Sequence, residues 1–176
     1  MINGFRRRST KSIRGGSPTP TSYGSDYKAS TMPAIKFRVP GDPRPQQRAG
    51  LNRRGAGATF FDRNASRQYK DVVKQTIEKS IGLSGPPPVP AIASGPVSVS
   101  IVIVHRCPKS SFRKKTPAPR RWRALTPDID NVTKSIFDGC TGYLWRDDRQ
   151  VVKLDVEQYT GAQDEQPHVL VEVDSL

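Results

Sequence analysis

Residues 97–105 place the strongest constraint on the fold of this chain. Apolar side chains at every second position give the period of a β-strand, at Val97, Val99, Ile101 and Ile103, and the series can extend to His105. The later half of the segment is apolar on both faces, as in a strand that has neighbours on both sides. The sequence therefore predicts a β-sheet in which residues 97–105 form a central strand.

The neighbouring segments predict the other elements of the sheet and a helical layer. Period-two alternation indicates three more strands, at residues 34–39, 151–159 and 168–173. Helical spacing of apolar residues indicates a helix over 62–81 and a second that starts at Asp128 or Asp130 and ends at Asp138, with Gly82 and Gly139 as the stops. The order β-α-β-α-β-β predicts an α+β fold, a single compact two-layer domain with a mixed β-sheet and both helices on one face.

The chain length and the first 33 residues define the domain organisation. A length of 176 residues is that of one domain with tails. Residues 1–33 contain six basic residues and one acid among Gly, Ser, Thr and Pro, with few large apolar residues. Such a composition cannot offset its ordering entropy. We therefore expect a disordered basic tail over 1–33 and a folded domain over 34–176.

The net charge of the chain restricts its partners. With 29 Lys and Arg against 16 Asp and Glu, the formal charge is +13, which favours nucleic acid as the partner. No stretch has the roughly 18 to 20 apolar residues of a membrane span, and the N-terminus lacks a signal peptide. Cys107 and Cys140 lack the spacing of a zinc site or a disulfide framework. The sequence predicts a cytoplasmic protein with reduced thiols, no membrane contact and no small-molecule cofactor.

Two segments of the predicted domain are basic and contain no acid. Residues 44–54 hold four arginines, and residues 106–123 hold eight basic residues and are kept extended by prolines. Phosphate contacts supply most of the affinity for DNA, so both segments are expected to grip the substrate as loops. The candidate DNA-binding residues are Arg44, Arg48, Arg53, Arg54, Arg113, Lys114, Lys115, Arg120, Arg121 and Arg123.

Acidic residues gather next to the second basic segment. They are Asp128, Asp130, Asp138, Asp147 and Asp148. Carboxylates placed close together repel one another unless a cation compensates, and Mg²⁺ binds one or two carboxylates together with substrate phosphate. Metal-activated water is the matching chemistry for phosphodiester cleavage. The cluster therefore predicts a metal-dependent nuclease.

The spacing sets conditions on the geometry of this site. In a continuous helix Asp128 and Asp130 would differ by about 200°, so they converge only if Asp130 is the N-cap and Asp128 lies in extended chain. Lys134 lies one turn after Asp130, within reach of a bound phosphate. Asp148 is expected at the start of the next strand, in phase with Val152 and Leu154 on the side that faces the core.

Each feature also has a purely structural interpretation. Asp128 or Asp130 alone is more often an N-cap, Asp130 with Lys134 is often an exposed ion pair, and Asp147 with Asp148 can open a turn. Trp122, between Arg121 and Arg123, fits base stacking at a crossover or packing against protein, and Phe112 has the same two interpretations. His105, His168 and Cys140 are predicted to be structural.

The acidic motifs carry a family resemblance. The stretch from Thr126 to Gly139 followed by Leu144 to Leu154 resembles the signature of RusA Holliday-junction resolvases, D-x-D-N-x-x-K-x-x-x-D and then D-D-x-Q-V. The segment from Pro40 to Arg48 is similar to the family's opening, G-x-P-x-P-K-x-R, with Gln46 in place of the lysine. The basic tail and an insertion over residues 108–125 are departures from the family. The resemblance covers about 35–174.

The resemblance implies a function and a set of site residues. It implies that Asp128, Asp130 and Asp148 bind Mg²⁺, with Mn²⁺ as a substitute, that Lys134 is the catalytic lysine, and that Asp147 is a less critical acid. It also implies a homodimer that makes paired symmetric nicks in a four-way DNA junction, and a bacterial or phage-encoded, nucleoid-associated protein. Our hypothesis is metal-activated attack of water on phosphorus, with Lys134 stabilising the developing charge.

Three alternatives remain open. A general branched-DNA nuclease would use the same residues. Pro127-Asp128 followed by Asp155 and Glu157 is similar to the PD-(D/E)xK nucleases but lacks their lysine. A non-catalytic basic protein that binds nucleic acid would use the acids as caps and turns. Metal-dependent cleavage separates the last alternative from the others.

Overall fold

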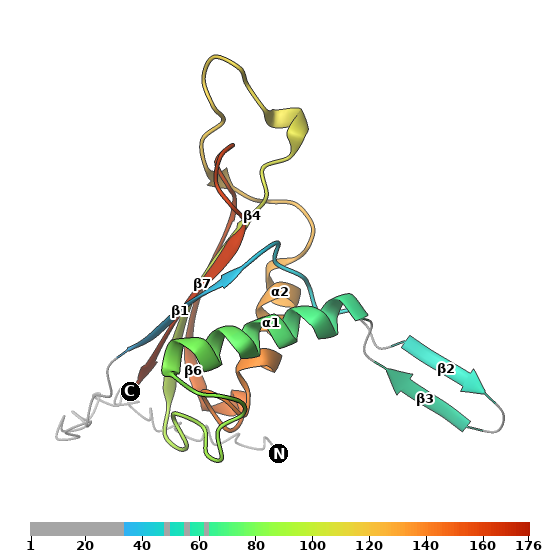
Figure 1. The fold of residues 1–176 in the computed structure, drawn as a ribbon, viewed down its shortest axis with the longest axis vertical. Helices are drawn as coiled ribbons and strands as arrows, with labels where there is room; N and C mark the ends of the chain where they lie inside the picture. The colour runs from blue at the N-terminus through green and yellow to red at the C-terminus, as the bar shows by residue number, and fades with distance from the viewer. Residues whose placement is uncertain (1–33, 48–49, 55–56, 62–63) are drawn as a thin grey trace, which may run out of the picture.

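The computed structural model describes residues 34–47, 50–54, 57–61 and 64–176. The predicted tail, residues 1–33, lies outside them. Two α-helices and seven strands, with two short 3₁₀ turns, make up this part of the chain (Figure 1). The elements are β1 (Ile35–Pro40), β2 (Gly50–Arg54), β3 (Gly57–Phe61), α1 (Asn64–Ile81), β4 (Val97–His105), η1 (Lys109–Ser111), β5 (Arg121–Trp122), α2 (Ile129–Cys140), η2 (Asp148–Gln150), β6 (Val151–Thr160) and β7 (His168–Ser175).

Five of the strands form one mixed sheet. Their order is β1-β7-β4-β6-β5, in which β4 and β6 are parallel and the other neighbours are antiparallel. Strand β4 lies between β7 and β6, so the prediction of a central strand is confirmed. A parallel pair needs a crossover connection, and residues 106–150, which include α2, make this crossover. The α+β class and the mixed sheet are also confirmed.

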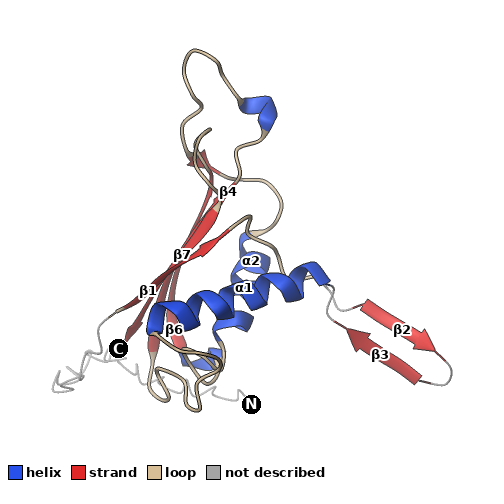
Figure 2. Ribbon diagram, in the orientation of Figure 1, coloured by secondary structure: helices blue, strands red, loops and turns tan. Residues whose placement is uncertain are grey.

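Both helices cover the same face of the sheet, as Figure 2 shows. The side chains on this face alternate along each strand with those on the other face. Phe37, Ile101 and Val171 face the helices and are buried together with Ile77 of α1 and Ile136 of α2. The core therefore lies between the helical layer and one face of the sheet, as the apolar periodicity predicted.

The helix ends follow their sequence signals in one case and not in the other. Gly82 ends α1 with a φ of +71°, and Leu83 N donates to Glu78 O at 2.7 Å. The prediction that Gly139 stops the second helix is wrong, because α2 continues to Cys140 and Gly139 is buried within it. Here the glycine allows a close approach to α1: an added Cβ would lie 2.7 Å from Cγ1 of Val73.

The two basic segments differ in structure. The prediction of a loop over residues 44–54 is wrong at its end, since β2 pairs with β3 in an antiparallel hairpin that extends from the start of α1 (Figure 1). The segment 106–123 is a loop over most of its length and projects beyond the ends of β4 and β7 (Figure 1). Gln163 anchors it, because its Oε1 accepts hydrogen bonds from the backbone N–H groups of Arg113 and Ala118.

No helix in the described part of the chain is long and apolar enough to cross a membrane.

Candidate active site

Asp128 stands at the N-cap of α2 in extended backbone, with φ −68° and ψ 144°. An N-cap carboxylate usually accepts a hydrogen bond from a backbone N–H of the first turn, but the Asp128 side chain makes no such bond. The side chain is exposed. Its carboxylate oxygens are therefore available to an external ligand.

Asp130 and Lys134 lie on the first two turns of α2. Both are exposed, and their spacing of four residues places them on the same helical face. The expectation that Asp130 is the N-cap is wrong, since Asp128 holds that position. Only the second half of the condition for convergence holds, because Asp128 lies in extended backbone whereas Asp130 is the second residue of the helix. We call Asp128, Asp130 and Lys134 the α2 N-terminal cluster.

Three backbone contacts hold this end of α2 in place. Val132 N donates to Asp128 O at 3.2 Å, and the buried Gln158 of β6 donates its Nε2 to Pro127 O at 3.0 Å. Gln46 N donates to Asn131 O at 2.8 Å. The segment from Pro40 to Arg48 and the acidic motif, about 80 residues apart in the sequence, therefore meet at the same site.

Gln46 also links the site to α1, because its Oε1 accepts a hydrogen bond from Ser66 Oγ at 3.1 Å. Sequence reasoning noted Gln46 only as a departure from the family's opening. Gln46 directly follows Pro43-Arg44-Pro45 in the sequence, within the segment similar to the family's opening. Only the fold shows that its backbone contacts α2.

A surface pocket lies beside the N-terminal cluster. Its lining includes Arg123, Leu125, Asp128 and Gln158. The Arg123 guanidinium donates to Thr126 O, and its Nη1 lies 3.5 Å from Thr160 Oγ1. Burial lowers the pKa of Arg123 from its usual value. This arginine braces the chain that enters α2, and the structure gives it a positioning role at this pocket.

Asp148 lies at the other end of α2. Its Oδ1 accepts hydrogen bonds from Thr141 Oγ1 at 2.6 Å and from Trp145 Nε1 at 2.9 Å. Thr141 is the C-cap of α2, and the helical rise of about 1.5 Å per residue places it about 16 Å from Asp130. Asp128, Asp130 and Lys134 thus lie at the N-terminal end of α2, whereas Asp148 lies at its C-terminal end.

The predicted strand phase of Asp148 is wrong. Asp148 is exposed and begins the turn η2, ahead of β6. Val152 and Leu154, which were expected to face the core, are 64% and 47% exposed. The pairing of β4 with β6 shifts register between Val97 and Ser98 and leaves Val152 without a partner on β4, whereas Leu154 pairs with the buried Val99 and is only partly covered.

Two neighbouring acids have structural partners. Asp147 caps η2, forms a capping box with Gln150 and pairs with Arg149 at 3.0 Å. The hydrogen bonds from Arg149 lower the pKa of Asp147 to about 2. Asp138 pairs with Lys70 of α1 at 2.9 Å. Both acids thus stabilise local structure, and the possible metal role of Asp147 stays a prediction.

The carboxylates of the N-terminal cluster suit a hard cation that also binds substrate. Within residues 34–47, 50–54, 57–61 and 64–176, no three His, Cys, Asp or Glu side chains form a group that could hold a metal ion. Mg²⁺ needs only one or two carboxylates when water and a substrate phosphate complete its coordination. Asp128 and Asp130, both exposed and without partners among the described residues, fit that donor set.

The family model described as endodeoxyribonuclease RusA matches residues 40–174 of the chain. The chain belongs to the RusA family. RusA proteins are endodeoxyribonucleases, so this protein is a hydrolase that acts on DNA, and membership supports action at Holliday junctions. It is also similar to YqaN of Bacillus subtilis (strain 168), an uncharacterized protein, with 31% identity over 145 residues, 80% of this chain and 95% of that protein.

The basic residues predicted to bind DNA differ in how free they are in this RusA protein. Arg44, Arg113, Lys114 and Lys115 are exposed, and no ion pair holds any of the four among the described residues. Arg120 is paired with Glu165, and Arg121 donates to Ser111. Arg48 lies outside the described residues, and Arg53 and Arg54 belong to β2. Within the 106–123 loop, Arg113, Lys114 and Lys115 are therefore the basic side chains most available to bind phosphate.

The two aromatic residues of the basic loop are exposed, whereas Cys140 and the two histidines are buried. Trp122 is 68% exposed and stacks on Tyr159, with ring centroids 4.3 Å apart, and Phe112 is also exposed. Neither belongs to the core. Cys140 is buried, as predicted. His105 and His168 are buried on strands, which agrees with structural roles.

The structure does not bring together the residues of the PD-(D/E)xK alternative. Asp155 and Glu157 of β6 pair with Ser100 and Val102 of β4 on the sheet face away from the helices. Asp128 enters α2 on the helical side. Asp128, Asp130 and Lys134, by contrast, all lie at the N-terminal end of α2.

Proposed function

We propose that this RusA-family chain is a Mg²⁺-dependent, structure-specific nuclease that resolves four-way DNA junctions by paired symmetric nicks in recombination and repair. The observation that carries the proposal is the N-terminal cluster: Asp128 and Asp130 are exposed and unpaired among the described residues, with Lys134 one turn further on the same face. Two basic segments, residues 44–54 and 106–123, precede the cluster in the sequence and can hold the DNA backbone.

We propose a division of roles among these residues. Asp128 and Asp130 would hold the metal, which when bound supplies an activated water and neutralises charge on the phosphate. The Lys134 ammonium would stabilise the charge that develops on the phosphate oxygens. The α2 N-terminus adds a partial positive charge at the same place. Cleavage of the P–O3′ bond would leave a 3′-hydroxyl and a 5′-phosphate, and Mn²⁺ would substitute for Mg²⁺.

Asp148 is part of the proposed ligand set on the sequence motif alone. Its carboxylate is held by Thr141 and Trp145 at the far end of α2. Asp148→Asn should abolish cleavage if this carboxylate acts in catalysis. An active Asp148→Asn protein would limit the site to the N-terminal cluster.

A two-fold substrate suits a two-fold enzyme. We therefore propose that the protein acts as a homodimer in which each subunit cuts one strand of the junction. We also propose that it acts on nucleoid DNA in the cytoplasm of a bacterium, encoded by the host or by a phage.

A nicking assay tests the proposal. Wild type, Asp130→Asn and the control Asp71→Asn, an exposed acid on α1, are incubated with a synthetic four-way junction or a linear duplex of the same sequence. The buffer contains Mg²⁺ or EDTA. We expect symmetric nicks on the junction only, lost in EDTA and reduced about 100-fold or more by Asp130→Asn, but not by Asp71→Asn.

Binding measured in parallel separates the alternatives. Asp130→Asn should keep or gain junction affinity, because it removes negative charge from a phosphate site. Salt-sensitive binding of wild type without cleavage would support a non-catalytic protein. Equal cleavage of flaps and three-way junctions would support a general branched-DNA nuclease. Loss of binding in folded Asp130→Asn would contradict the assignment.

A further inference from the structure

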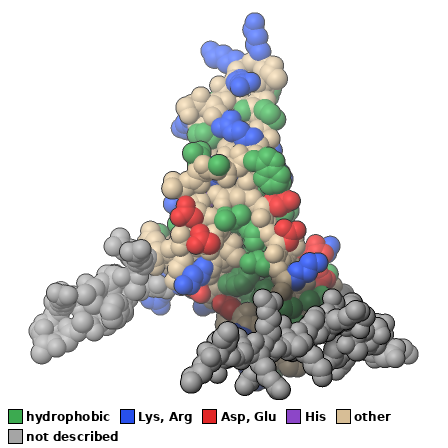
Figure 3. Space-filling view, turned by 180° about the vertical axis from the view of Figure 1, so that it is seen from behind, with side chains coloured by type: hydrophobic (Ala, Val, Ile, Leu, Met, Phe, Trp, Pro, Cys, Tyr) green, Lys and Arg blue, Asp and Glu red, His purple; other side chains and the backbone are tan. Residues whose placement is uncertain are grey.

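The face of the sheet opposite the helices carries charged and apolar side chains, of which the Lys36–Glu172 ion pair and the Tyr159–Glu157 hydrogen bond account for only a part. On β1, β7, β4 and β6, the residues that alternate with the core positions point to this side. In Figure 3, hydrophobic and acidic side chains lie along this face, and Lys and Arg side chains lie at one end of the molecule and at the sides of the face. We call Lys36, Arg38, Ser100, Val102, Asp155, Glu157, Leu170 and Glu172 the open face.

The register of the strands arranges the open face in rows. One row runs Lys36, Glu172, Ser100 and Asp155 across β1, β7, β4 and β6, and the next runs Arg38, Leu170, Val102 and Glu157. Each row has a basic residue on β1 and an acidic residue on β6.

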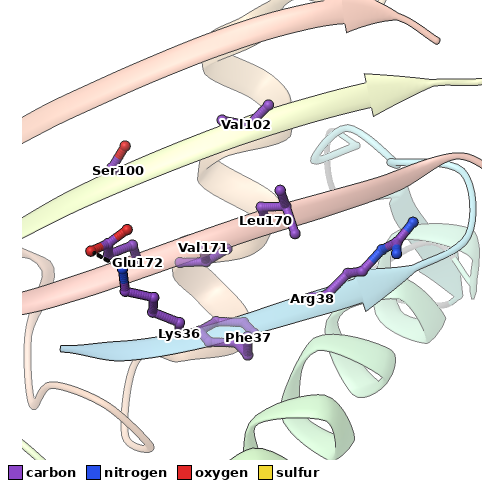
Figure 4. Close-up of a pocket in the computed structure, with 8 residues that line it drawn as sticks. All are labelled: Lys36, Phe37, Arg38, Ser100, Val102, Leu170, Val171 and Glu172. Carbon is purple, nitrogen blue, oxygen red and sulfur yellow. Dashed lines mark ion pairs between the residues drawn. The ribbon is translucent and has the colours of Figure 1, made fainter. Parts of the chain in front are cut away.

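The middle of the second row is apolar. Leu170 is 41% exposed and lies beside Val102. A surface pocket follows these strands, and Figure 4 shows Arg38, Leu170 and Val102 along it with Lys36 paired to Glu172. Among the described residues neither Arg38 nor Asp155 has an ion-pair partner. The second row thus has an apolar centre between a basic residue on β1 and an acidic residue on β6, and Lys153 of β6 lies on the same face beyond Asp155.

Such a surface is complementary to itself. Rotation by 180° about an axis that runs along the strands between β7 and β4 brings β1 of one copy opposite β6 of the other. Because this rotation leaves positions along the strands unchanged, each row meets the same row of the partner. Lys36 then faces Asp155 of the partner subunit, and Arg38 faces Glu157 of the partner subunit. An isologous interface has this property, since one patch binds its own copy.

We propose that a second copy of this chain packs face to face on the open face, around a two-fold axis parallel to the strands. This inference rests on the homodimer of the proposed function and names its surface. Sheets that pack face to face lie about 10 Å apart, a gap that long basic and acidic side chains can bridge. Leu170 and Val102 meet at the centre and lose water, which drives association.

The same axis fits the use of a four-way junction. The loop 106–123 projects beyond the ends of β4 and β7 (Figure 1). Rotation about an axis parallel to the strands leaves the strand direction unchanged, so both copies of the loop project from the same end of the dimer. Both helical layers lie on the outside, with the two α2 N-terminal clusters related by the axis. One junction could then meet both basic loops at once.

Charge reversal tests the interface. The self-association of the full chain is measured by sedimentation velocity over a range of concentrations, for wild type, Arg38→Glu and Glu157→Arg. Each single variant places like charges opposite each other in its own dimer, so we expect dimer affinity to fall about tenfold or more. Lys79→Glu, a reversal at an exposed residue of α1, should leave the affinity unchanged.

Mixing the two single variants provides the rescue. In a heterodimer of Arg38→Glu with Glu157→Arg, both charge pairs across the interface are opposite in sign again. We expect the mixture to dimerise within about threefold of wild type. Repair inside one subunit cannot explain this result, because β1 and β6 are three strands apart, about 14 Å. Glu157→Arg also removes the acceptor of the Tyr159 hydroxyl, but mixing would not restore that bond.

Several outcomes would overturn the inference. A wild type that stays monomeric at all concentrations would do so, as would a mixture that fails to dimerise. A monomer that dimerises only after residues 1–33 are removed would show that another part of the chain covers this face. Junction cleavage is scored separately: cleavage by a dimer that ignores the reversals overturns only this inference, whereas a charge-sensitive dimer that does not cut overturns only the proposed function.

Discussion

The indole Nε1 of Trp145 donates a hydrogen bond to Oδ1 of Asp148 at 2.9 Å. The indole is fully buried, and the carboxylate is exposed. Thr141 Oγ1 donates to the same oxygen at 2.6 Å. A rigid part of the core therefore fixes the orientation of a surface acid, although Asp148 itself lies on a short turn. The two hydrogen bonds fix the direction of the Asp148 carboxylate. Removing one of them tests whether this direction contributes to cleavage.

Thr141→Val removes one of these donors while keeping the shape of the side chain. We expect junction cleavage to fall about tenfold or more, as for residues that orient a catalytic carboxylate, with a small change in stability. Thr76→Val is the matched control, because Thr76 Oγ1 bonds only the carbonyl of Val72 one turn earlier on α1. Equal cleavage by both variants, measured at saturating Mg²⁺, would show that the position of Asp148 does not matter.

The free basic side chains of the loop 106–123 should dominate its contribution to DNA affinity. Replacing Arg113, Lys114 and Lys115 with Ala removes up to three phosphate contacts. The slope of log affinity against log salt should then become shallower by about 2 to 3. Binding to junction and to linear duplex should weaken together, which a fluorescence titration at several salt concentrations measures.

Arg120→Ala is the comparison for that experiment. Arg120 is already paired with Glu165, so its loss should change the salt slope by less than one. A change as large as that of the triple variant would mean that the pair opens when DNA binds.

The regular elements could be predicted because burial imposes a period on them. Val99, Ile101 and Ile103 must face the helices, and Val73 and Ile77 must face the sheet, so their spacing is visible in the sequence. The hairpin of β2 and β3 has no such pattern: its strands read GLNRR and GATFF, without regular alternation, and its pairing is local. The basic composition of residues 44–54 therefore predicted a loop, and it gave no sign that residues 50–54 form a strand.

The arrangement of the motif residues was predicted only in part, and their roles stay predictions. Helical spacing correctly placed Lys134 one turn after Asp130 on α2. The location of Asp148 depends on Thr141 and Trp145 and on the register shift at Val97, none of which alternation reveals. Likewise, the contact of Gln46 with α2 depends on chain segments that meet only in the folded protein.

The close packing of α1 on α2 can be tested at Gly139. Gly139→Ala places a methyl group 2.7 Å from Cγ1 of Val73, and such overpacking should lower the free energy of unfolding by about 1 to 3 kcal/mol. Val73→Ala should lower it too, by opening a cavity. In the double variant the new methyl group fills part of that space. We expect a favourable coupling of about 1 kcal/mol or more in a double-mutant cycle from urea unfolding; additive effects would contradict the tight contact.

His105 predicts a loss of stability in mild acid. Burial, together with the nearby charge of Arg123, lowers the pKa of His105 to about 4, whereas an unfolded histidine has a pKa of about 6.5. Between these values the unfolded chain takes up a proton that the native state refuses, so stability falls as the pH drops through this window. The contribution of His105 between pH 7 and pH 5 is at most about 2 kcal/mol.

His105→Gln removes this titration. Urea unfolding at pH 7 and pH 5 should show a smaller loss of stability in the variant than in wild type. An equal loss in both proteins would assign the acid sensitivity to other groups.

The position of β7 between β1 and β4 has a consequence for biosynthesis. Strand β7 follows every other element in sequence, yet β1 has no other neighbour in the sheet and β4 has only β6 on its other side. While residues 168–175 are still inside the ribosome, the two halves of the sheet cannot join, and the apolar faces of β1 and β4 stay without their common partner. A nascent chain can therefore expose its basic loop before β1 and β4 gain their common partner, and the sheet closes only once β7 is available.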